Sequence, residues 1–311
     1  MMVTVLRALG TLAVLSCGSA AHALTFQFST VSGDSLTTAQ SAAFGTAANA
    51  WSAVLTDPVT VQVQIGFRDL GTDSQSNVIL GQTGLSLFSV DYAGFKVALT
   101  ADATSASDSV AVAHLPATTP DNTVLGTSAG LRAAGVIAVA ATDGIIEFTS
   151  RSGVTFAPTR AQLDSSNYDL IGVAEHEIGH LLGFVSSVDQ SNQTMRSPLD
   201  LYRYTSPGGL SFTAGQTAYF SIDGGTTNLA NFSVGGVGQY QASHWLQGTG
   251  ALMDPAVSKG VQQNITLLDL RALDVIGWDV AVPEPGTMSL LVVGLLGAGL
   301  RAGRRGLQRT K

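Results

Sequence analysis

The stretch Val173-Ala174-Glu175-His176-Glu177-Ile178-Gly179-His180-Leu181-Leu182-Gly183-Phe184 contains the pattern H-E-x-x-H followed by x-x-G. On a helix, His176 and His180 lie four residues apart and project from one face, so both imidazoles can reach one metal ion. Imidazole suits Zn²⁺, and a catalytic zinc takes three protein ligands and leaves its fourth position to water. Glu177 is then the candidate general base.

The residues around this pattern are mostly apolar. Apart from Glu175 and the motif's own histidines and glutamate, the stretch from Leu170 to Phe184 carries no charged side chain. Such a helix is buried on most sides, where two histidines and a glutamate are costly without a partner. A metal ion supplies that partner, and the alternative is a pair of ordinary core histidines. Gly183 can adopt positive φ and is expected to end the helix.

The chain begins with the features of a secretory signal peptide. Residues 1–23 contain one basic residue, an apolar run and the ending Ala21-His22-Ala23 of the A-x-A type, so we expect cleavage before Leu24. The alternative is lipidation at Cys17, which ends a loose lipobox-like string. Cys17 is the only cysteine, so the cleaved chain has no disulfide and no cysteine that can block a zinc site.

The other end has the composition of a sorting signal. Pro283-Glu284-Pro285 precedes an apolar run over residues 288–300 and then an arginine-rich end. The run is short for a membrane span, which needs about 17 to 25 residues. Residues 283–311 resemble the PEP-CTERM sorting tail of Gram-negative bacteria. The resemblance implies an exosortase as partner, transient membrane association and delivery to the cell surface or extracellular matrix. The alternative is a plain membrane anchor.

The region between these segments is acidic. Residues 24–282 hold nine of the 15 basic residues and 21 of the 22 acidic ones, which gives a formal charge near −12. This balance argues against nucleic acid or anionic lipid as a partner. The low charged fraction is typical of a soluble secreted protein.

Periodicity in the first half indicates a sheet with helices packed on it, which is an α+β fold. Alternation predicts strands over residues 25–29 and 59–67, and apolar residues at helical spacing predict a helix over residues 38–53. Weaker helical patterns cover residues 90–103 and 129–134. A strand over residues 145–149 either lies at the sheet edge, where it can pair with an extended peptide, or lies inside the sheet. Ser165, Ser166 or Asn167 is expected to cap the histidine-bearing helix.

The second half contains fewer regular patterns. Residues 218–222 read as a strand that runs into a hairpin at Asp223-Gly224, and residues 267–276 read as a helix ended by Gly277-Trp278. Tyr202, Arg203 and Tyr204 can line a cleft, but packing is the more natural role for them.

The third metal ligand does not follow from spacing alone. The common metzincin pattern H-E-x-x-H-x-x-G-x-x-H places it at position 186, where this chain has Ser186, a poor zinc ligand. Three candidates remain: Asp189 shortly after the helix, His114 far upstream, and His244 downstream. A carboxylate and an imidazole are both established zinc ligands.

Two further segments resemble the leishmanolysin-type metzincins. Ser243-His244-Trp245 is followed by Ala251-Leu252-Met253-Asp254-Pro255, and a long insertion separates both segments from Gly183. The resemblance implies that His176, His180 and His244 bind zinc, that Glu177 is the general base and that Met253 forms a Met-turn beneath the metal.

The same resemblance implies a twisted mixed sheet with the active-site helix in residues 24–184. It further implies a C-terminal subdomain in residues 185–282, which carries the insertion, the third ligand, the Met-turn and a terminal helix.

The expected function is that of a secreted zinc-dependent endopeptidase. Zinc-activated water attacks a protein or peptide substrate while Glu177 acts as general base. One alternative is a non-catalytic surface or matrix protein with a structural zinc site, although such sites usually have four protein ligands. Another is a zinc hydrolase that acts on cell-wall or polysaccharide material.

Overall fold

The computed structural model describes residues 24–136, 140–189 and 195–281. The expected signal peptide and the sorting tail over residues 283–311 lie outside these ranges. Among the described residues, no helix has both the length and the apolar character needed to cross a bilayer.

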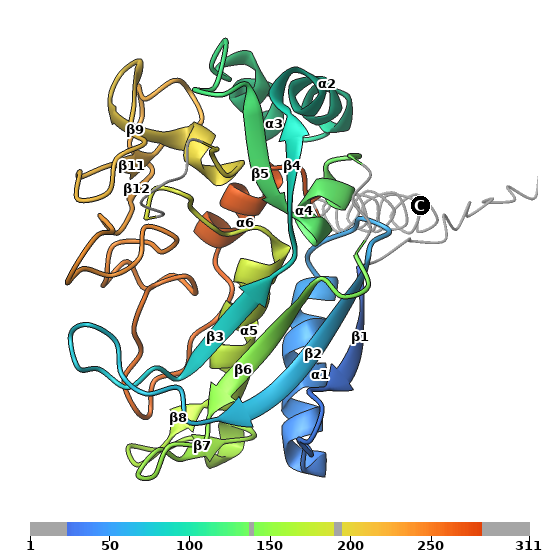
Figure 1. The fold of residues 1–311 in the computed structure, drawn as a ribbon, viewed down its shortest axis with the longest axis vertical. Helices are drawn as coiled ribbons and strands as arrows, with labels where there is room; N and C mark the ends of the chain where they lie inside the picture. The colour runs from blue at the N-terminus through green and yellow to red at the C-terminus, as the bar shows by residue number, and fades with distance from the viewer. Residues whose placement is uncertain (1–23, 137–139, 190–194, 282–311) are drawn as a thin grey trace, which may run out of the picture.

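The main sheet contains β1 (Thr25–Thr30), β2 (Thr60–Arg68), β6 (Gly144–Thr149) and β3 (Gly81–Leu85), in the order β1-β2-β6-β3 (Figure 1). The first three strands are parallel, and β3 runs antiparallel to β6 at the edge. The first two strands and β6 were predicted. The edge position considered for residues 145–149 is wrong, because β3 covers that side of β6. Strand β3 was not predicted, because its sequence Gly-Gln-Thr-Gly-Leu lacks the apolar alternation that marks a strand.

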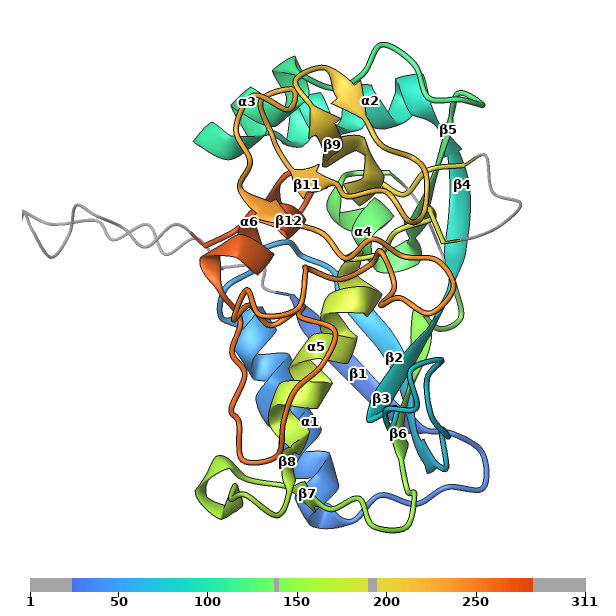
Figure 2. The ribbon, with the colours of Figure 1, turned by 90° about the vertical axis from the view of Figure 1, so that its left-hand side faces the viewer.

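Two helices pack against the same face of this sheet, as Figure 2 shows. They are α1 (Thr38–Ser52) and α5 (Leu170–Leu182). The predicted apolar stripe of α1 is buried, and its Trp51 donates the indole Nε1–H to the carbonyl oxygen of Glu175 in α5 at 2.9 Å. Thr37 and Gln40 form a capping box that starts α1. The first predicted helix is therefore confirmed, and it braces the histidine-bearing helix.

A two-stranded sheet with three neighbouring helices follows β3 in the chain. The strands β4 (Leu87–Asp91) and β5 (Thr123–Thr127) pair antiparallel, and α2 (Tyr92–Asp102), α3 (Ala106–Ala113) and α4 (Ser128–Ala133) lie beside them. The helix predicted over residues 90–103 therefore starts late, because Val90 and Asp91 still belong to β4 and Asp91 caps α2. The helix predicted over residues 129–134 is confirmed as α4.

The second half of the chain is mainly irregular, with short elements. A small sheet has the order β10-β9-β11-β12. Its strands are β9 (Arg203–Ser206), β10 (Gly209–Leu210), β11 (Tyr219–Phe220) and β12 (Ala230–Asn231). The hairpin predicted near Asp223-Gly224 joins β11 to β12 through a longer loop. The other elements are β7 (Phe156–Ala157), β8 (Tyr168–Asp169), α6 (Leu267–Asp274) and the short 3-10 helices η1 (Arg160–Gln162) and η2 (Leu199–Tyr202).

The fold is α+β, as predicted. Tyr202, Arg203 and Tyr204 are buried, Arg203 and Tyr204 within β9 itself, and none of the three lines the large cleft described below. Tyr202 donates its hydroxyl to the carbonyl oxygen of Val275 at 2.8 Å. The segment after α5 is thereby fastened to the end of α6.

Candidate metal centre

Helix α5 begins later in the chain than predicted, because the short strand β8 lies between the expected caps and the helix. Its N-cap is Asp169, whose side chain accepts the backbone N–H of Ile171 at 3.1 Å, and not one of the residues 165–167. The reason is that β8 continues in extended form through Asp169. Gly183 ends the helix at a φ of 124°, as predicted, a value that residues with a side chain rarely adopt.

Three histidine side chains meet at the half-buried side of α5. The Nε2 atom of His180 lies 3.1 Å from that of His176 and 3.2 Å from that of His244. The Nε2 atoms of His176 and His244 are also 3.2 Å apart. His176 and His180 come from successive turns of α5, and His244 comes from the irregular segment before α6. The structure therefore brings the two motif histidines together with one of the three candidate third ligands.

Each imidazole uses its other nitrogen, Nδ1, to contact a backbone carbonyl. The pairs are His176 with Leu252 at 2.8 Å, His180 with Phe184 at 2.7 Å and His244 with Gln241 at 3.2 Å. A carbonyl oxygen only accepts, so each Nδ1 carries the proton and each Nε2 presents a lone pair. Three lone pairs then point at one another with no proton between them, and a cation can relieve that repulsion.

The triangle fits the donor set of zinc. Bond lengths of about 2.0–2.1 Å and tetrahedral angles place two imidazole nitrogens roughly 3.3 Å apart on one zinc ion, close to the observed separations. Burial lowers the pKa of His180 to about 3 and lowers the pKa of His244 well below its ordinary value. Neutral imidazole is the form that binds metal, and three ligands leave a fourth position open.

Met253 lies under α5, where a glycine leaves room for it. A Cβ atom on Gly179 would stand 2.5 Å from Met253 Sδ, so only glycine permits this contact without movement. The carbonyl oxygen of Met253 also accepts the backbone N–H of Trp245 at 3.0 Å. The methionine segment is thereby joined to the segment that carries His244.

Glu177 lies beside the histidines, against strand β3. Thr83 directs its hydroxyl to Glu177 Oε2 at 2.7 Å, and a Cβ on Gly81 would meet Glu177 Oε1 at 2.6 Å. Burial raises the pKa of Glu177, while His176 and the Thr83 hydrogen bond act in the opposite direction. Local sequence patterns do not reveal Gly81 or Thr83, because only the register of the sheet brings these residues to the helix.

A third residue that local sequence patterns did not reveal is Asp269 at the start of α6. Its side chain accepts hydrogen bonds from the segment around His244 and Met253. The signal was present in the sequence, since Thr266 and Asp269 form a capping box. What the local pattern did not indicate is that this carboxylate also bonds outside its own helix.

The other candidate ligands do not join the histidines. Asp189 lies in the same cleft, but its carboxylate accepts the backbone N–H groups of Gly236 at 2.9 Å and Ala242 at 2.6 Å. It holds the loop that leads to His244. His114 ends α3, where its Nδ1 contacts the Val110 carbonyl at 2.8 Å. Ser186 donates its hydroxyl to Asp200 at 2.6 Å.

A cleft of about 1480 Å³ opens over the triangle. Strand β3 forms one wall, and residues 239–248 and 254–266 contribute the other. Gln75, in the loop before β3, reaches across to the Gly238 carbonyl at 3.1 Å. The cleft can hold an extended chain beside the sheet edge, because the outer edge of β3 pairs with no strand of the described residues.

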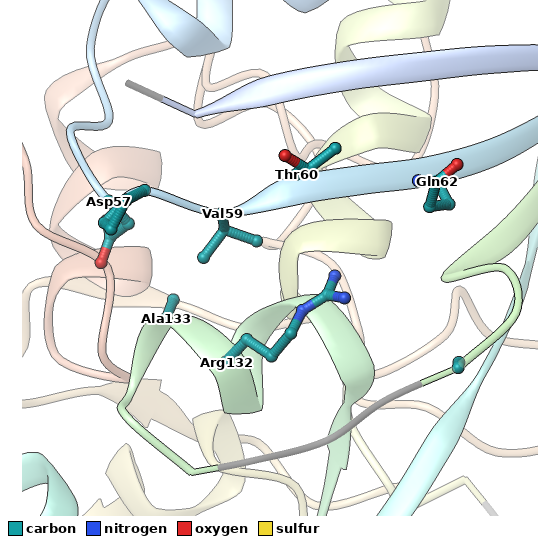
Figure 3. A pocket seen from close by; sticks show the side chains of 8 residues that line it. Asp57, Val59, Thr60, Gln62, Arg132 and Ala133 are labelled. Carbon is teal, nitrogen blue, oxygen red and sulfur yellow. The ribbon is translucent and has the colours of Figure 1, made fainter. Parts of the chain in front are cut away.

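Two polar groupings lie elsewhere. A smaller hollow between β2 and α4 is lined by Asp57 and Arg132 (Figure 3). Arg132 Nη2 lies 2.7 Å from the carboxylate of Asp143. Asp57 also forms a carboxylate cluster with Asp102 and Asp279. Burial raises the pKa of both Asp57 and Asp102 to about 7.

Comparison with protein families gives one match, at the end of the chain. Residues 281–305 match the PEP-CTERM protein-sorting motif. This motif implies recognition by an exosortase and sorting to the surface or exterior of a Gram-negative cell, as predicted. No curated protein and no solved structure matches the chain. The match does not include α5 or the segment that carries His244.

Proposed function

We propose that this protein is a secreted zinc-dependent endopeptidase with a metzincin-like fold. His176, His180 and His244 would hold the zinc ion, and Glu177 would be the general base. The observation that carries the proposal is the triangle of Nε2 atoms, each made available by an Nδ1 contact to a backbone carbonyl. The glycine that ends α5 and the methionine beneath it support the metzincin-like arrangement.

The proposed chemistry assigns one task to each residue. When bound, zinc supplies Lewis acidity, which polarises a scissile carbonyl and lowers the pKa of water to about 7. Glu177 accepts the proton of the attacking water and delivers it to the leaving amine. The histidines stay neutral and fixed. The edge of β3 and the opposite cleft wall hold the peptide in extended form.

The sorting motif supports a substrate outside the cell. A protein that an exosortase sorts to the surface meets other surface, matrix or environmental proteins there. The cleft volume of about 1480 Å³ exceeds the roughly 300–1,000 Å³ of small-molecule pockets, which suits a segment of polypeptide better than a small molecule.

The test compares wild type with Glu177→Ala, both loaded with zinc and shown to be folded. The expected result is peptide-bond hydrolysis by wild type and a loss of roughly 10²–10⁴-fold in the variant. Zinc content stays equal, because Glu177 is not a ligand. The matched control is Glu147→Gln, which breaks the pair with Arg68 on the far side of the sheet and leaves the rate unchanged.

Two other outcomes favour the alternatives. Hydrolysis of a polysaccharide or cell-wall fragment, but not of peptides, indicates a zinc hydrolase with another substrate. Bound zinc without hydrolysis of any substrate indicates a structural zinc site in a surface protein.

A further inference from the structure

Strand β3 presents one face to α5 around the carboxylate of Glu177. Residues 81, 83 and 85 share that face because side chains alternate along a strand. Thr83 is paired with Ile146 of β6, which fixes its height on the sheet. Its Oγ1 lies 2.7 Å from Glu177 Oε2 and 3.0 Å from the backbone carbonyl oxygen of Glu177.

The two carboxylate oxygens of Glu177 have different surroundings. Oε2 accepts the Thr83 hydroxyl. Oε1 accepts no hydrogen bond from the described residues, yet it is not among the buried unpaired atoms, so it faces the cleft. A Cβ on Gly81 would stand 2.6 Å from Oε1, so a side chain at that position would displace it. One oxygen is thus held and the other is open.

The Thr83 hydroxyl restrains the Glu177 carboxylate strongly, because the rest of the site supplies few other partners for that carboxylate. Glu177 is 5% exposed, and none of the described residues forms a Lys or Arg ion pair with it. A glutamate side chain has several rotamers, and a buried carboxylate without a cation depends on hydrogen bonds. Among the described residues, the Thr83 hydroxyl is the one side-chain donor to it.

We propose that Thr83 is the positioning residue of Glu177. Its hydroxyl anchors Oε2, so that Oε1 stays directed into the cleft and can take the proton of the attacking water. This role rests on the proposed function. In this assignment the Thr83 side chain does not bind the metal, and its hydroxyl acts through Glu177.

The kinetic test uses three variants at the same position. Thr83→Val keeps the shape and removes the hydroxyl, Thr83→Ala removes it without a branched side chain, and Thr83→Ser retains it. Misplacement of the base is expected to lower kcat by about 10- to 100-fold for Val and Ala, with KM unchanged within about threefold. Ser restores kcat. Thr60→Val is the matched control, because it removes from the same sheet a hydroxyl whose one side-chain hydrogen-bond partner among the described residues is Thr25.

A second measurement does not depend on activity. Crystal structures of the zinc-loaded proteins are expected to show one Glu177 rotamer in wild type and Thr83→Ser, and several in Thr83→Val, with equal zinc content. If the rotamers differ in this way but no variant hydrolyses peptides, the role of Thr83 in positioning Glu177 is supported and the proposed peptidase function is wrong. An unchanged rotamer, or a full kcat in Thr83→Val, overturns the role of Thr83 and leaves the peptidase intact.

Discussion

Trp245 donates its indole Nε1–H to Asp269 Oδ1 at 2.9 Å, which fastens the residue next to His244 to the first turn of α6. The other oxygen, Oδ2, accepts the backbone N–H of Leu252 at 3.0 Å. Leu252 in turn offers its carbonyl to His176. Asp269 has no exposed surface. The buried Asp269 carboxylate therefore helps to position His244, through the neighbouring Trp245, and His176, through Leu252.

We expect Asp269→Asn to weaken zinc binding by about 10- to 100-fold, as do losses of groups that orient metal ligands elsewhere. The amide has one acceptor oxygen in place of two, so either the Trp245 or the Leu252 donor is left unsatisfied. Each such loss destabilises by about 1–3 kcal/mol. Zinc competition against a chromophoric chelator and urea unfolding measure both effects. Asp223→Asn, in the distant β11–β12 hairpin, serves as control, and equal zinc affinity in the two variants contradicts the prediction.

The identity of the third ligand is decided by two alanine variants. His244→Ala removes an atom of the triangle and is expected to abolish stoichiometric zinc binding, as are His176→Ala and His180→Ala. Asp189→Ala removes only the acceptor for two backbone N–H groups, so zinc remains bound with reduced affinity. Metal content after dialysis reports the difference. Full zinc in His244→Ala together with none in Asp189→Ala makes the carboxylate the ligand.

Two helical glycines are expected to respond oppositely to alanine. A Cβ on Gly179 strikes Met253 Sδ, so Gly179→Ala should destabilise by about 1–3 kcal/mol. Gly45 in α1 has nothing within 4 Å of that position. Gly45→Ala should therefore stabilise by up to about 1 kcal/mol, the helix-propensity difference. Thermal unfolding of both variants tests the pair, and a Gly179→Ala protein as stable as wild type rules out the tight methionine contact.

The carboxylate cluster should make stability depend on pH. Burial raises the pKa of Asp57 and Asp102 to about 7 in the folded chain, against about 3.9 when unfolded. Between these values the folded chain binds more protons, so the unfolding free energy falls as pH rises from about 4 to 7. Asp102→Asn removes one of these charges and should be more stable than wild type at pH 7.5, with the gain shrinking towards pH 4.

Urea unfolding at pH 4.5, 6 and 7.5 follows this difference. Asp69→Asn is the control, because Asp69 is exposed and its hydrogen bond from Gly71 lowers its pKa. If Asp102→Asn is less stable than wild type at pH 7.5, the prediction is wrong and the charged carboxylate cluster stabilises the fold.

The local parts of the site were predictable from the sequence. Helical spacing places His176 and His180 on one face, and Gly183 ends the helix because the chain must take a positive φ there. Both inferences depend only on residues within one helix. The strands β1 and β2 and the helix α1 were likewise marked by periodicity.

The non-local parts were not predictable from local patterns. His244 is 64 residues from His180, and residue chemistry alone left Asp189 and His114 as rivals. Thr83 reaches Glu177 only because β3 pairs antiparallel with β6, a register that Gly-Gln-Thr-Gly-Leu does not encode in its own pattern. For the same reason, local patterns could not decide between an edge and an interior position for residues 145–149, and the structure shows the interior one.

The Nδ1 acceptors of the three histidines are all main-chain atoms. A peptide carbonyl survives every substitution of its residue, so Phe184, Gln241 and Leu252 can change identity without deleting the group that aligns each imidazole. Descendants of this chain can thus diverge at those positions and still inherit the triangle. What they must preserve is the path of the backbone, and a shift in that path disturbs the alignment even where every histidine is retained.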